Sequence, residues 1–442
     1  MKITVIGTGY VGLVSGICLA SKGHVVTCLD KNKSIVKSLN ASKATIHEDG
    51  IENILSSVIN EKNFFVTSDF NEALNSAEAV IIAVGTPSDN GQIDLTYLLE
   101  ASRQIGNYIL NNDRYLTVII KSTVIPGTTD TIVRKEIEKI SKKKLGDFGL
   151  GMNPEFLREG NAINDFMYPD RIVLGFEDEK TLSILEEIYA PWDTEKIRVN
   201  TRTAELIKYA NNSLLATQIS AINEIANFAN KLGDIKMKDV VQGIHLDKRW
   251  NPTIGNKRSN PEILNYLRPG CGFGGSCFTK DIQAIKSQGE KLDLNMSIMN
   301  AVLDVNADQP YKISEIIEKN VGDLNSKKIL ILGLAFKPGT DDVRESPSLK
   351  IITDLMNKGA KIFAHDPVAS KNFINTLGSI STKIEFVENW QNILEQTEII
   401  ILVTPWEEYF SLIDCNINNK VIFDTRRALS PNKKNKAKYL YV

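Results

Sequence analysis

The chain has 442 residues, of which 42% are hydrophobic and 24% are charged. At about 150 residues per domain, this length predicts two or three domains that can bury their cores without disulfides or metals. The 52 lysines and arginines nearly balance the 54 aspartates and glutamates, and the net charge is −2. This balance predicts no nucleic acid and no membrane as a partner, and the composition excludes intrinsic disorder.

The cysteines and histidines show no metal-binding or disulfide pattern. The five cysteines are Cys18, Cys28, Cys271, Cys277 and Cys415. Neither they nor the four histidines have CxxC or HxxxH spacing, so no metal site is predicted. An odd number of scattered cysteines is typical of a protein of the reducing cytoplasm. No run approaches ~18 apolar residues, so no membrane span is predicted.

The N-terminal segment has the pattern of a dinucleotide-binding βαβ unit. A predicted buried strand is followed by Gly7-x-Gly9-x-x-Gly12, a predicted helix and a second strand that ends at Asp30. Asp30 follows Gly12 by 30 − 12 = 18 residues, close to the ~20 of the dinucleotide fingerprint. The glycines let backbone amides approach a pyrophosphate. Asp30 would bind a ribose diol and oppose a 2′-phosphate, which favours NAD over NADP.

The C-terminal segment 328–366 repeats the plan of residues 2–30. Each begins with an apolar strand and a glycine, Gly7 or Gly333, and each has an aspartate seven residues after a later glycine (366 − 359 = 30 − 23 = 7). Strands alternating with helices predict an α/β protein with two Rossmann-like, doubly wound domains. The second lacks GxGxxG, so we expect no second dinucleotide. Its segment 336–347 follows the first strand, and Lys337 and Arg344 in that segment suit phosphate groups.

A long helix is predicted between these domains. Apolar residues recur at three- and four-residue steps from Ile207 to Leu232, which predicts one helix from about Thr201 to Leu232, ended by Gly233. At ~1.5 Å per residue it would be roughly 50 Å long, enough to join two domains or to build a dimer. We therefore expect three parts. They are an NAD-binding domain at 1–200, a central helical region at 201–310 that includes a cysteine loop at 270–281, and a second Rossmann-like domain at 311–442.

The glycine-rich segment 270–281 is the most unusual stretch of the chain. Its four glycines allow the backbone to approach a ligand, and a helical pattern follows Ser276. Cys277 would then lie at a helix N-terminus near Lys280, and both features favour a thiolate. The alternative is a glycine-rich turn with a passive thiol, and Cys271 shares the loop. Cys277 is preferred because it alone has a helix start, a lysine and an aspartate within four residues.

Two further pairs have helical spacing. Glu155 and Glu159 are four residues apart and are predicted to share one face of a helix. Such a pair has cationic partners or performs acid–base chemistry, unless both glutamates are simply solvated. Lys208 and Asn212 share one face of the long central helix in the same way. A solvated lysine is the alternative there.

Together these segments resemble the UDP-glucose 6-dehydrogenase family of nucleotide-sugar dehydrogenases. The resemblance runs nearly end to end. Its motifs are Gly7–Gly12, Lys121–Val124, Asn153–Leu157, Pro169–Ile172, Gly272–Cys277 and Arg344–Ser346. It implies an N-terminal NAD domain, a helical dimerisation core and a C-terminal UDP-sugar-binding domain. It also implies a four-electron reaction, in which a UDP-hexose, two NAD and water give a UDP-uronic acid and two NADH.

The resemblance also implies roles for individual residues. Cys277 would be the nucleophile that carries a thiohemiacetal and then a thioester, and Lys208 would stabilise the oxyanion. The other implied catalytic residues are Asn212, Asp281, Glu155 and Thr123. Those matched to NAD contacts are Gly7, Gly9, Tyr10, Val11, Gly12, Asp30, Lys33, Thr86, Thr123, Glu159, Lys280 and Arg344. Those matched to the substrate are Glu155, Phe156, Leu157, Arg158, Glu159, Lys208, Asn212, Arg249, Gly272, Phe273, Gly274, Phe278, Phe336 and Lys337.

Several alternatives stay open. The same chemistry could act on a UDP-N-acetylhexosamine or on GDP-mannose, since the stretch 250–265 is longer than the family usually has. Arg249 is the best match for an arginine that reaches the sugar, but Arg258 and Arg268 are alternatives. A two-electron hydroxy-acid dehydrogenase would leave the cysteine loop without a role. A non-catalytic protein that senses NAD and nucleotides would not need a cysteine at a helix start. The expected partners are a nucleotide sugar and further copies of the chain, as a homodimer or higher homo-oligomer.

Overall fold

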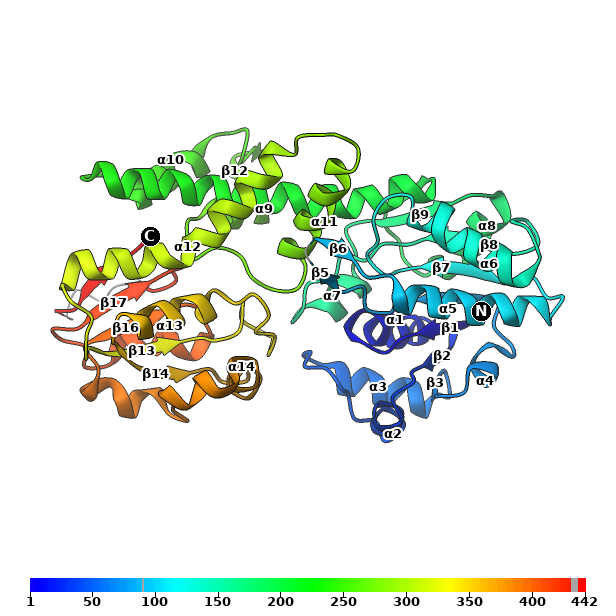
Figure 1. Cartoon of the computed structure of the whole chain (residues 1–442), viewed down its shortest axis with the longest axis horizontal. Coiled ribbons are helices and arrows are strands. Elements are labelled where there is room, and N and C mark those ends of the chain that lie inside the picture. Colours follow the sequence, from blue (N-terminus) through cyan, green and yellow to red (C-terminus); the bar gives the residue numbers. More distant parts are fainter. Residues whose placement is uncertain (90, 431–435) are drawn as a thin grey trace. The chain divides into compact units, whose positions relative to one another are not determined.

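The computed structural model describes residues 1–89, 91–430 and 436–442, and it divides the chain into two compact units, residues 1–211 and 212–442. The long central helix, α9 (Thr201–Leu232), contributes residues to both units (Figure 1). It ends before Gly233, whose φ of 80° lies in the left-handed region that favours glycine. The predicted helix and its end are thus confirmed, whereas the division into three parts stays a prediction.

The first unit is built on an eight-stranded sheet with the order β10-β9-β8-β7-β4-β1-β2-β3. The strands are β1 (Lys2–Ile6), β2 (Val25–Leu29), β3 (Phe64–Thr67), β4 (Ala79–Ile82), β7 (Thr117–Ile120), β8 (Gly149–Met152), β9 (Ile172–Phe176) and β10 (Lys196–Val199). The six from β8 to β3 are parallel, as predicted. β9 runs antiparallel to β8, and β10 runs parallel to β9. The reversal leaves residues 153–171 as a connection at the carboxyl edge of β8.

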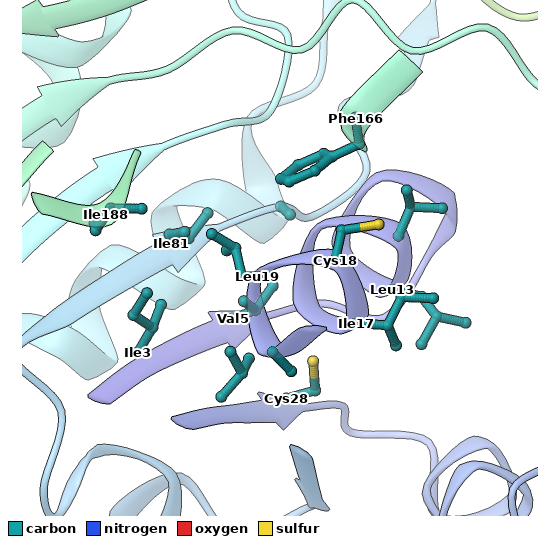
Figure 2. Packing of buried hydrophobic residues seen from close by; sticks show 14 of the residues in the cluster. Ile3, Val5, Leu13, Ile17, Cys18, Leu19, Cys28, Ile81, Phe166 and Ile188 are labelled. Carbon is teal, nitrogen blue, oxygen red and sulfur yellow. The ribbon is translucent and has the colours of Figure 1, made fainter. Parts of the chain in front are cut away.

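Helices cover both faces of this sheet. The helices and minor elements are α1 (Tyr10–Ser21), α2 (Lys33–Asn40), α3 (Ile51–Asn60), α4 (Phe70–Leu74), β5 (Ser88–Asp89), β6 (Gln92–Ile93), α5 (Thr96–Leu110), η1 (Thr128–Val133), α6 (Arg134–Ser141), α7 (Ala162–Met167) and α8 (Glu179–Ile188). One core joins the sheet to α1, α3, α7 and α8, and another joins it to α4, α5 and α6. Figure 2 shows Cys28 on β2 pointing toward α1. A Cβ on Gly16 would lie 2.6 Å from the Cys28 sulfur, so glycine lets α1 close on the sheet.

The second unit repeats the strand order of the first. Its six parallel strands have the order β15-β14-β13-β16-β17-β18, which matches β3-β2-β1-β4-β7-β8 strand for strand. They are β13 (Lys328–Leu332), β14 (Lys361–His365), β15 (Ile384–Phe386), β16 (Ile399–Leu402), β17 (Val421–Asp424) and β18 (Lys438–Leu440). The Gly7 N–H donates to the Leu29 carbonyl and the Gly333 N–H to the His365 carbonyl, each at 2.9 Å. The predicted repeat is therefore confirmed down to equivalent backbone bonds.

Helices also form the rest of the second unit. These and the minor elements are α10 (Met237–Leu246), β11 (Thr253–Ile254), β12 (Lys257–Arg258), η2 (Glu262–Leu267), α11 (Phe278–Glu290), α12 (Ser297–Val321), α13 (Pro347–Asn357), α14 (Ser370–Leu377), η3 (Gly378–Lys383), η4 (Trp390–Gln396) and η5 (Glu407–Asp414). The long stretch 250–265 thus forms the small β11–β12 hairpin and most of a short helical turn. Across the described parts of the chain, no helix is both long enough and apolar enough to cross a membrane.

Candidate active site

The turn between β1 and α1 has the geometry that a pyrophosphate requires. A Cβ on Gly12 would lie 1.9 Å from the Gly7 carbonyl oxygen, so only glycine allows this close packing. A Cβ on Gly9 would meet no atom within 4 Å, which leaves open space beside that backbone. α1 begins after Gly9 with no side-chain hydrogen bond capping it in the described structure. Its first amides, including those of Tyr10 and Val11, therefore suit an anionic group.

Asp30 is held in a fixed orientation at the carboxyl end of β2. Its Oδ2 accepts hydrogen bonds from the backbone N–H of Thr8, at 3.0 Å, and from the Thr8 hydroxyl. Its Oδ1 accepts from the Asn32 N–H at 2.8 Å. Lys33, at the start of α2, is exposed. A carboxylate at this strand end fits the ribose of a dinucleotide bound across the glycine turn.

Glu48 connects the glycine turn to the connection after β8. Its buried carboxylate accepts from the backbone N–H groups of Gly160, at 2.8 Å, and Ala162, at 2.6 Å. It also accepts from the Tyr10 hydroxyl, which itself accepts from the Gly160 N–H at 2.7 Å. Burial and the adjacent Glu48 carboxylate raise the pKa of Tyr10, so the phenol stays a donor. Sequence reasoning missed Glu48, because its partners lie 38 to 114 residues away.

Glu155 forms a buried ion pair with Lys208 of α9. The distance from Glu155 Oε1 to Lys208 Nζ is 2.8 Å, and the two side chains are only 7% and 5% exposed. Burial alone would raise the pKa of the Glu155 carboxyl. The Lys208 ammonium, the Leu157 N–H and Lys121 outweigh burial and hold that pKa below its ordinary value. Glu155 is therefore a carboxylate at neutral pH.

The predicted helix through Glu155 and Glu159 is wrong. Residues 153–158 are an irregular loop, and a turn follows. The Leu157 N–H donates to the Glu155 carboxylate at 2.6 Å, a local bond that competes with a helix. The neighbouring side chains are also engaged. The Phe156 ring centre lies 3.9 Å from the guanidinium carbon of Arg171, and Arg158 forms an ion pair with Asp165 at 2.7 Å.

Thr86 and Thr123 meet where β4 and β7 end. The Thr86 hydroxyl donates to the Thr123 carbonyl oxygen at 2.8 Å. Thr86 is buried and Thr123 is half-buried. Parallel strands present their carboxyl ends at one edge of a sheet, which is where open α/β sheets bind ligands. The first unit thus brings the glycine turn, Asp30, both threonines and Glu155 to a single edge.

In the second unit, Cys277 is the residue that precedes α11, as predicted. Its side chain is half-buried, and the Ser276 hydroxyl oxygen lies 3.7 Å from its sulfur. Cys271 is fully buried, and its sulfur accepts from the Thr425 hydroxyl at 3.6 Å. Of the two thiols in the loop, only Cys277 combines partial exposure with the positive end of a helix.

Asp281 lies in the first turn of α11 and binds two other predicted site residues. Its buried carboxylate accepts from the Asn212 side-chain amide at 2.7 Å and from the Lys280 ammonium at 2.7 Å. Asn212 comes from α9, one helical turn after Lys208. The charge of Lys280 is thus shared with Asp281 rather than directed at the Cys277 sulfur alone. This row of side chains supplies a carboxylate and a cation at the same helix start.

Amide side chains hold the cysteine loop by its backbone. The Gly270 N–H donates to Asn223 of α9 at 2.8 Å, and its carbonyl accepts from Gln309 of α12 at 2.8 Å. The Phe273 N–H donates to Asn306 of α12 at 2.7 Å, and its carbonyl accepts from the same amide at 3.1 Å. We call Asn223, Asn306 and Gln309 the amide clamp. Sequence reasoning missed it, although polar residues on the inner face of a helix are a usable signal.

The segment after β13 packs against the same loop. A Cβ on Gly274 would lie 2.4 Å from the Glu345 carbonyl oxygen, and the Gly275 N–H donates to the Arg344 carbonyl at 2.9 Å. A Cβ on Gly275 would also lie 2.8 Å from the Phe336 ring. The rings of Phe273 and Phe278 meet edge to face at 5.6 Å. The second unit therefore brings together the predicted residues Gly272, Phe273, Gly274, Phe278, Phe336, Lys337 and Arg344.

The predicted arginines have different positions. Arg249 follows α10 and is paired with Asp247 at 2.5 Å, with its side chain 87% exposed. Arg258 donates to the Asn251 carbonyl at 2.9 Å. Arg426 donates to the Gly272 carbonyl of the cysteine loop at 2.9 Å. The role of Arg249 in substrate binding stays a prediction.

The counterpart of Asp30 in the second unit has different neighbours. Asp366 accepts from the backbone N–H groups of Leu334, Ala335, Val368 and Ala369 and from the indole of Trp406, at 2.7 to 3.1 Å. A Cβ on Gly333 would lie 2.4 Å from Thr404. Five donors therefore occupy the Asp366 carboxylate. Asp30, its counterpart in the first unit, can still accept hydrogen bonds from a ribose.

Comparisons with known proteins agree with this geometry. Three family models match the chain: the UDP-glucose/GDP-mannose dehydrogenase family's NAD binding domain at residues 1–193, its central domain at 202–308 and its UDP binding domain at 330–431. A UDP-glucose 6-dehydrogenase of Rickettsia bellii is 38% identical, over 98% of this chain and 96% of its own.

Two solved structures extend the comparison. A UDP-glucose dehydrogenase from Pyrobaculum islandicum is 38% identical, with a TM-score of 0.88 over 99% of this chain and 96% of its own. A UDP-D-ManNAc dehydrogenase from Pyrococcus horikoshii is 26% identical, with a TM-score of 0.82 over 99% of each chain. The predicted family and fold are confirmed. The chain belongs to the UDP-glucose/GDP-mannose dehydrogenase family.

Proposed function

We propose that the chain oxidises UDP-glucose to UDP-glucuronate in an NAD-dependent, four-electron reaction. The observation that carries this proposal is the partly exposed thiol of Cys277 at the start of α11. A two-electron alcohol oxidation needs no nucleophile. A thiol is needed when the aldehyde must be carried on to an acid, because it holds the carbon covalently between two oxidations.

The C6 alcohol first loses a hydride and its hydroxyl proton, which gives the C6 aldehyde. The Cys277 sulfur adds to the C6 aldehyde, a C–S bond forms, and the thiol proton passes to the oxygen. Loss of a hydride from that carbon and of the hydroxyl proton gives a thioester. Water then adds to the thioester carbon, the C–S bond breaks, and the thiol regains a proton as the acid leaves. Bound NAD supplies the acceptor for each hydride, and the glycine turn with Asp30 suits its pyrophosphate and ribose.

Other side chains would stabilise the oxyanion, exchange protons and activate water. We assign stabilisation of the oxyanion to Lys208, with Asn212 beside it on α9. Asp281 would exchange protons with the reacting oxygens, and its bonds to Asn212 and Lys280 orient its carboxylate. Glu155, ionised by its lysine partner, would activate or orient the attacking water, and Thr123 would help to position it.

Substrate and cofactor contacts are proposed for the residues around these groups. The loop residues 155–159, the cysteine loop, Phe336 and Lys337 would bind the UDP-sugar. Glu159, Lys280 and Arg344 would contact NAD. UDP-glucose is favoured over an N-acetylhexosamine because the relatives named for UDP-glucose are 38% identical, against 26% for the one named for UDP-D-ManNAc. Arg249 is retained as the arginine that reaches the sugar.

We further infer a three-part protein that works as a homodimer or higher homo-oligomer in the cytoplasm. The parts are 1–200, 201–310 and 311–442, with the middle part building the subunit contact. Support comes from α9, where Leu214 and Phe228 are 64% and 67% exposed. Ile225, Phe228 and Leu232 are exposed at three- and four-residue steps of the same helix, and a continuous exposed apolar face is typical of a surface that another chain covers. The reducing conditions of the cytoplasm also favour a free, unoxidised thiol.

The first test counts electrons. Complete conversion of a limiting amount of UDP-glucose should give two NADH per sugar, because the thioester route oxidises the same carbon twice. NADH is measured by absorbance, and the product by chromatography as UDP-glucuronate. One NADH per sugar with accumulating aldehyde would overturn the thioester mechanism. An N-acetylhexosamine or GDP-mannose turned over faster than UDP-glucose would reassign the sugar.

The cofactor preference tests Asp30. NAD should exceed NADP in kcat/KM by at least about tenfold, ~1.4 kcal/mol, since the fixed carboxylate accepts from a diol and repels a phosphate. Asp30→Asn keeps the size of the side chain and removes its charge, so it should narrow that ratio. Steady-state kinetics with both cofactors measure the effect. Equal use of NAD and NADP by the natural chain would show that Lys31 or Lys33 compensates for Asp30.

A further inference from the structure

Lys121 joins the ends of two neighbouring strands beside the candidate site. It is the first residue after β7, and Asn153 is the first residue after β8. The Lys121 ammonium donates to the Asn153 side-chain oxygen at 2.7 Å. The Asn153 amide in turn donates to the Val173 carbonyl of β9 at 2.9 Å. One side-chain bridge therefore fixes the carboxyl ends of β7 and β8 against each other and against the amino end of the antiparallel β9.

Each end of this bridge lies two residues before a residue of the candidate site. Lys121 lies two residues before Thr123, and Asn153 lies two residues before Glu155. Both Thr123 and Glu155 are proposed to handle the attacking water. Any shift of the bridge would therefore move both groups relative to one another, and a displacement of about 1 Å in such a pair can cost 10²-fold in rate.

The bridge also carries a buried charge. Lys121 is 3% exposed, and the Phe166 ring of α7 lies 5.5 Å from its ammonium. The titratable groups around it are Glu155 from the loop after β8, Lys208 from α9 and Tyr189 beyond α8, whose hydroxyl donates to the same Asn153 oxygen. Glu155 and Lys208 neutralise each other in their ion pair. Protonated Lys121 thus leaves this cluster of two lysines and one glutamate with one positive charge in excess.

That charge is lost at mildly alkaline pH. Burial lowers the pKa of Lys121 to about 8, and Lys208 adds to the effect while Glu155 opposes it. Burial also raises the pKa of Tyr189, so its phenol stays neutral over the same range. Below pH 8 the cluster is cationic, and above it the Glu155–Lys208 pair stands without the third charge.

We propose that Lys121 is a positioning residue for this reaction: it fixes Thr123 and Glu155 through Asn153, and its ammonium supplies the excess positive charge beside the Glu155–Lys208 pair. The inference rests on the proposed function, because it concerns the rate of the same oxidation. An excess cation beside the Glu155–Lys208 pair keeps Glu155 ionised, and it adds to the positive charge that Lys208 would present to an anionic transition state.

The test compares pH profiles of turnover. The natural chain should lose kcat with an apparent pKa near 8, as Lys121 loses its proton. Lys121→Met removes the charge and the bridge at similar length, so kcat at neutral pH should fall by roughly 10²-fold and the limb near pH 8 should disappear. Lys121→Arg retains a charge that does not titrate in this range, so activity should recover in part and the limb should move at least one pH unit higher.

Controls separate this role from general damage. Lys196→Met removes another lysine of the first unit, one that donates to the Trp192 carbonyl at 2.8 Å, and should leave the profile unchanged. KM for UDP-glucose and for NAD should change by less than about threefold in Lys121→Met. A folded Lys121→Met with the natural pH profile overturns the inference. If that variant does not fold, an unmoved limb in Lys121→Arg overturns it instead. A natural chain that makes no NADH from UDP-glucose overturns the proposed function first.

Discussion

Replacing Cys277 with serine should reduce kcat by ~10³-fold or more, while UDP-glucose still binds. The hydroxyl has nearly the shape of the thiol, but it is a poorer nucleophile, and its ester would hydrolyse far more slowly than a thioester. The variant should stall, in part as a covalent adduct about one UDP-sugar heavier than the chain. Steady-state kinetics measure the loss, and intact-mass spectrometry detects the adduct.

Cys271→Ser is the matched control. Cys271 shares the loop, but it is fully buried and accepts a hydrogen bond from Thr425, which a serine hydroxyl could also accept. We expect it to keep most of its activity. A dead Cys271→Ser beside an active Cys277→Ser would mean that the other thiol is the nucleophile. If both variants are active, the loop is structural and the thioester proposal fails.

Lys208→Ala should lower both activity and stability. Removal of one oxyanion donor typically costs 10²–10³-fold in kcat. It would also leave the Glu155 carboxylate buried at 7% exposure without its main cation, and breaking a buried pair in this way costs about 3–5 kcal/mol of unfolding free energy. Urea unfolding followed by circular dichroism measures the second effect independently of the first.

The double variant Glu155→Gln/Lys208→Met separates these two effects. It removes both charges together, so most of the stability should return while activity stays lost. The pKa of Glu155 is lowered in the folded chain, so its contribution to stability is present above its unfolded pKa of about 4.3 and is lost as pH falls through the folded value. The stability advantage of the natural chain over the double variant should therefore shrink below about pH 4. An advantage that grows on acidification would contradict this account.

Most of the fold could be predicted because its signals are local. Apolar strands, glycine turns and the strand-end aspartates identified both Rossmann-like domains, and the steps from Ile207 to Leu232 identified α9. The reversal of β9 could not be predicted in this way. Strand direction depends on how the connection at 153–171 runs, and a short apolar strand has the same sequence pattern in either direction.

The candidate site was predictable where chemistry and position coincide in sequence. Cys277 has a helix start beside it, and the structure has that helix start. The spacing of Glu155 and Glu159 misled, since a side-chain bond to Leu157 replaces the helix. Glu48 and the amide clamp were not identified, and Lys121 was named only as part of the motif Lys121–Val124, without a role. Each acts through partners 30 to more than 100 residues away, and no local pattern records such a pairing.

The amide clamp has a consequence for how pH profiles of this enzyme family member should be interpreted. Asn223, Asn306 and Gln309 grip the cysteine loop with neutral groups that neither gain nor lose protons in water. The scaffold that presents the thiol is therefore indifferent to acidity. Any limb in the rate profile then reports the ionisation of reacting or charged groups, and not a loosening of the loop that carries Cys277.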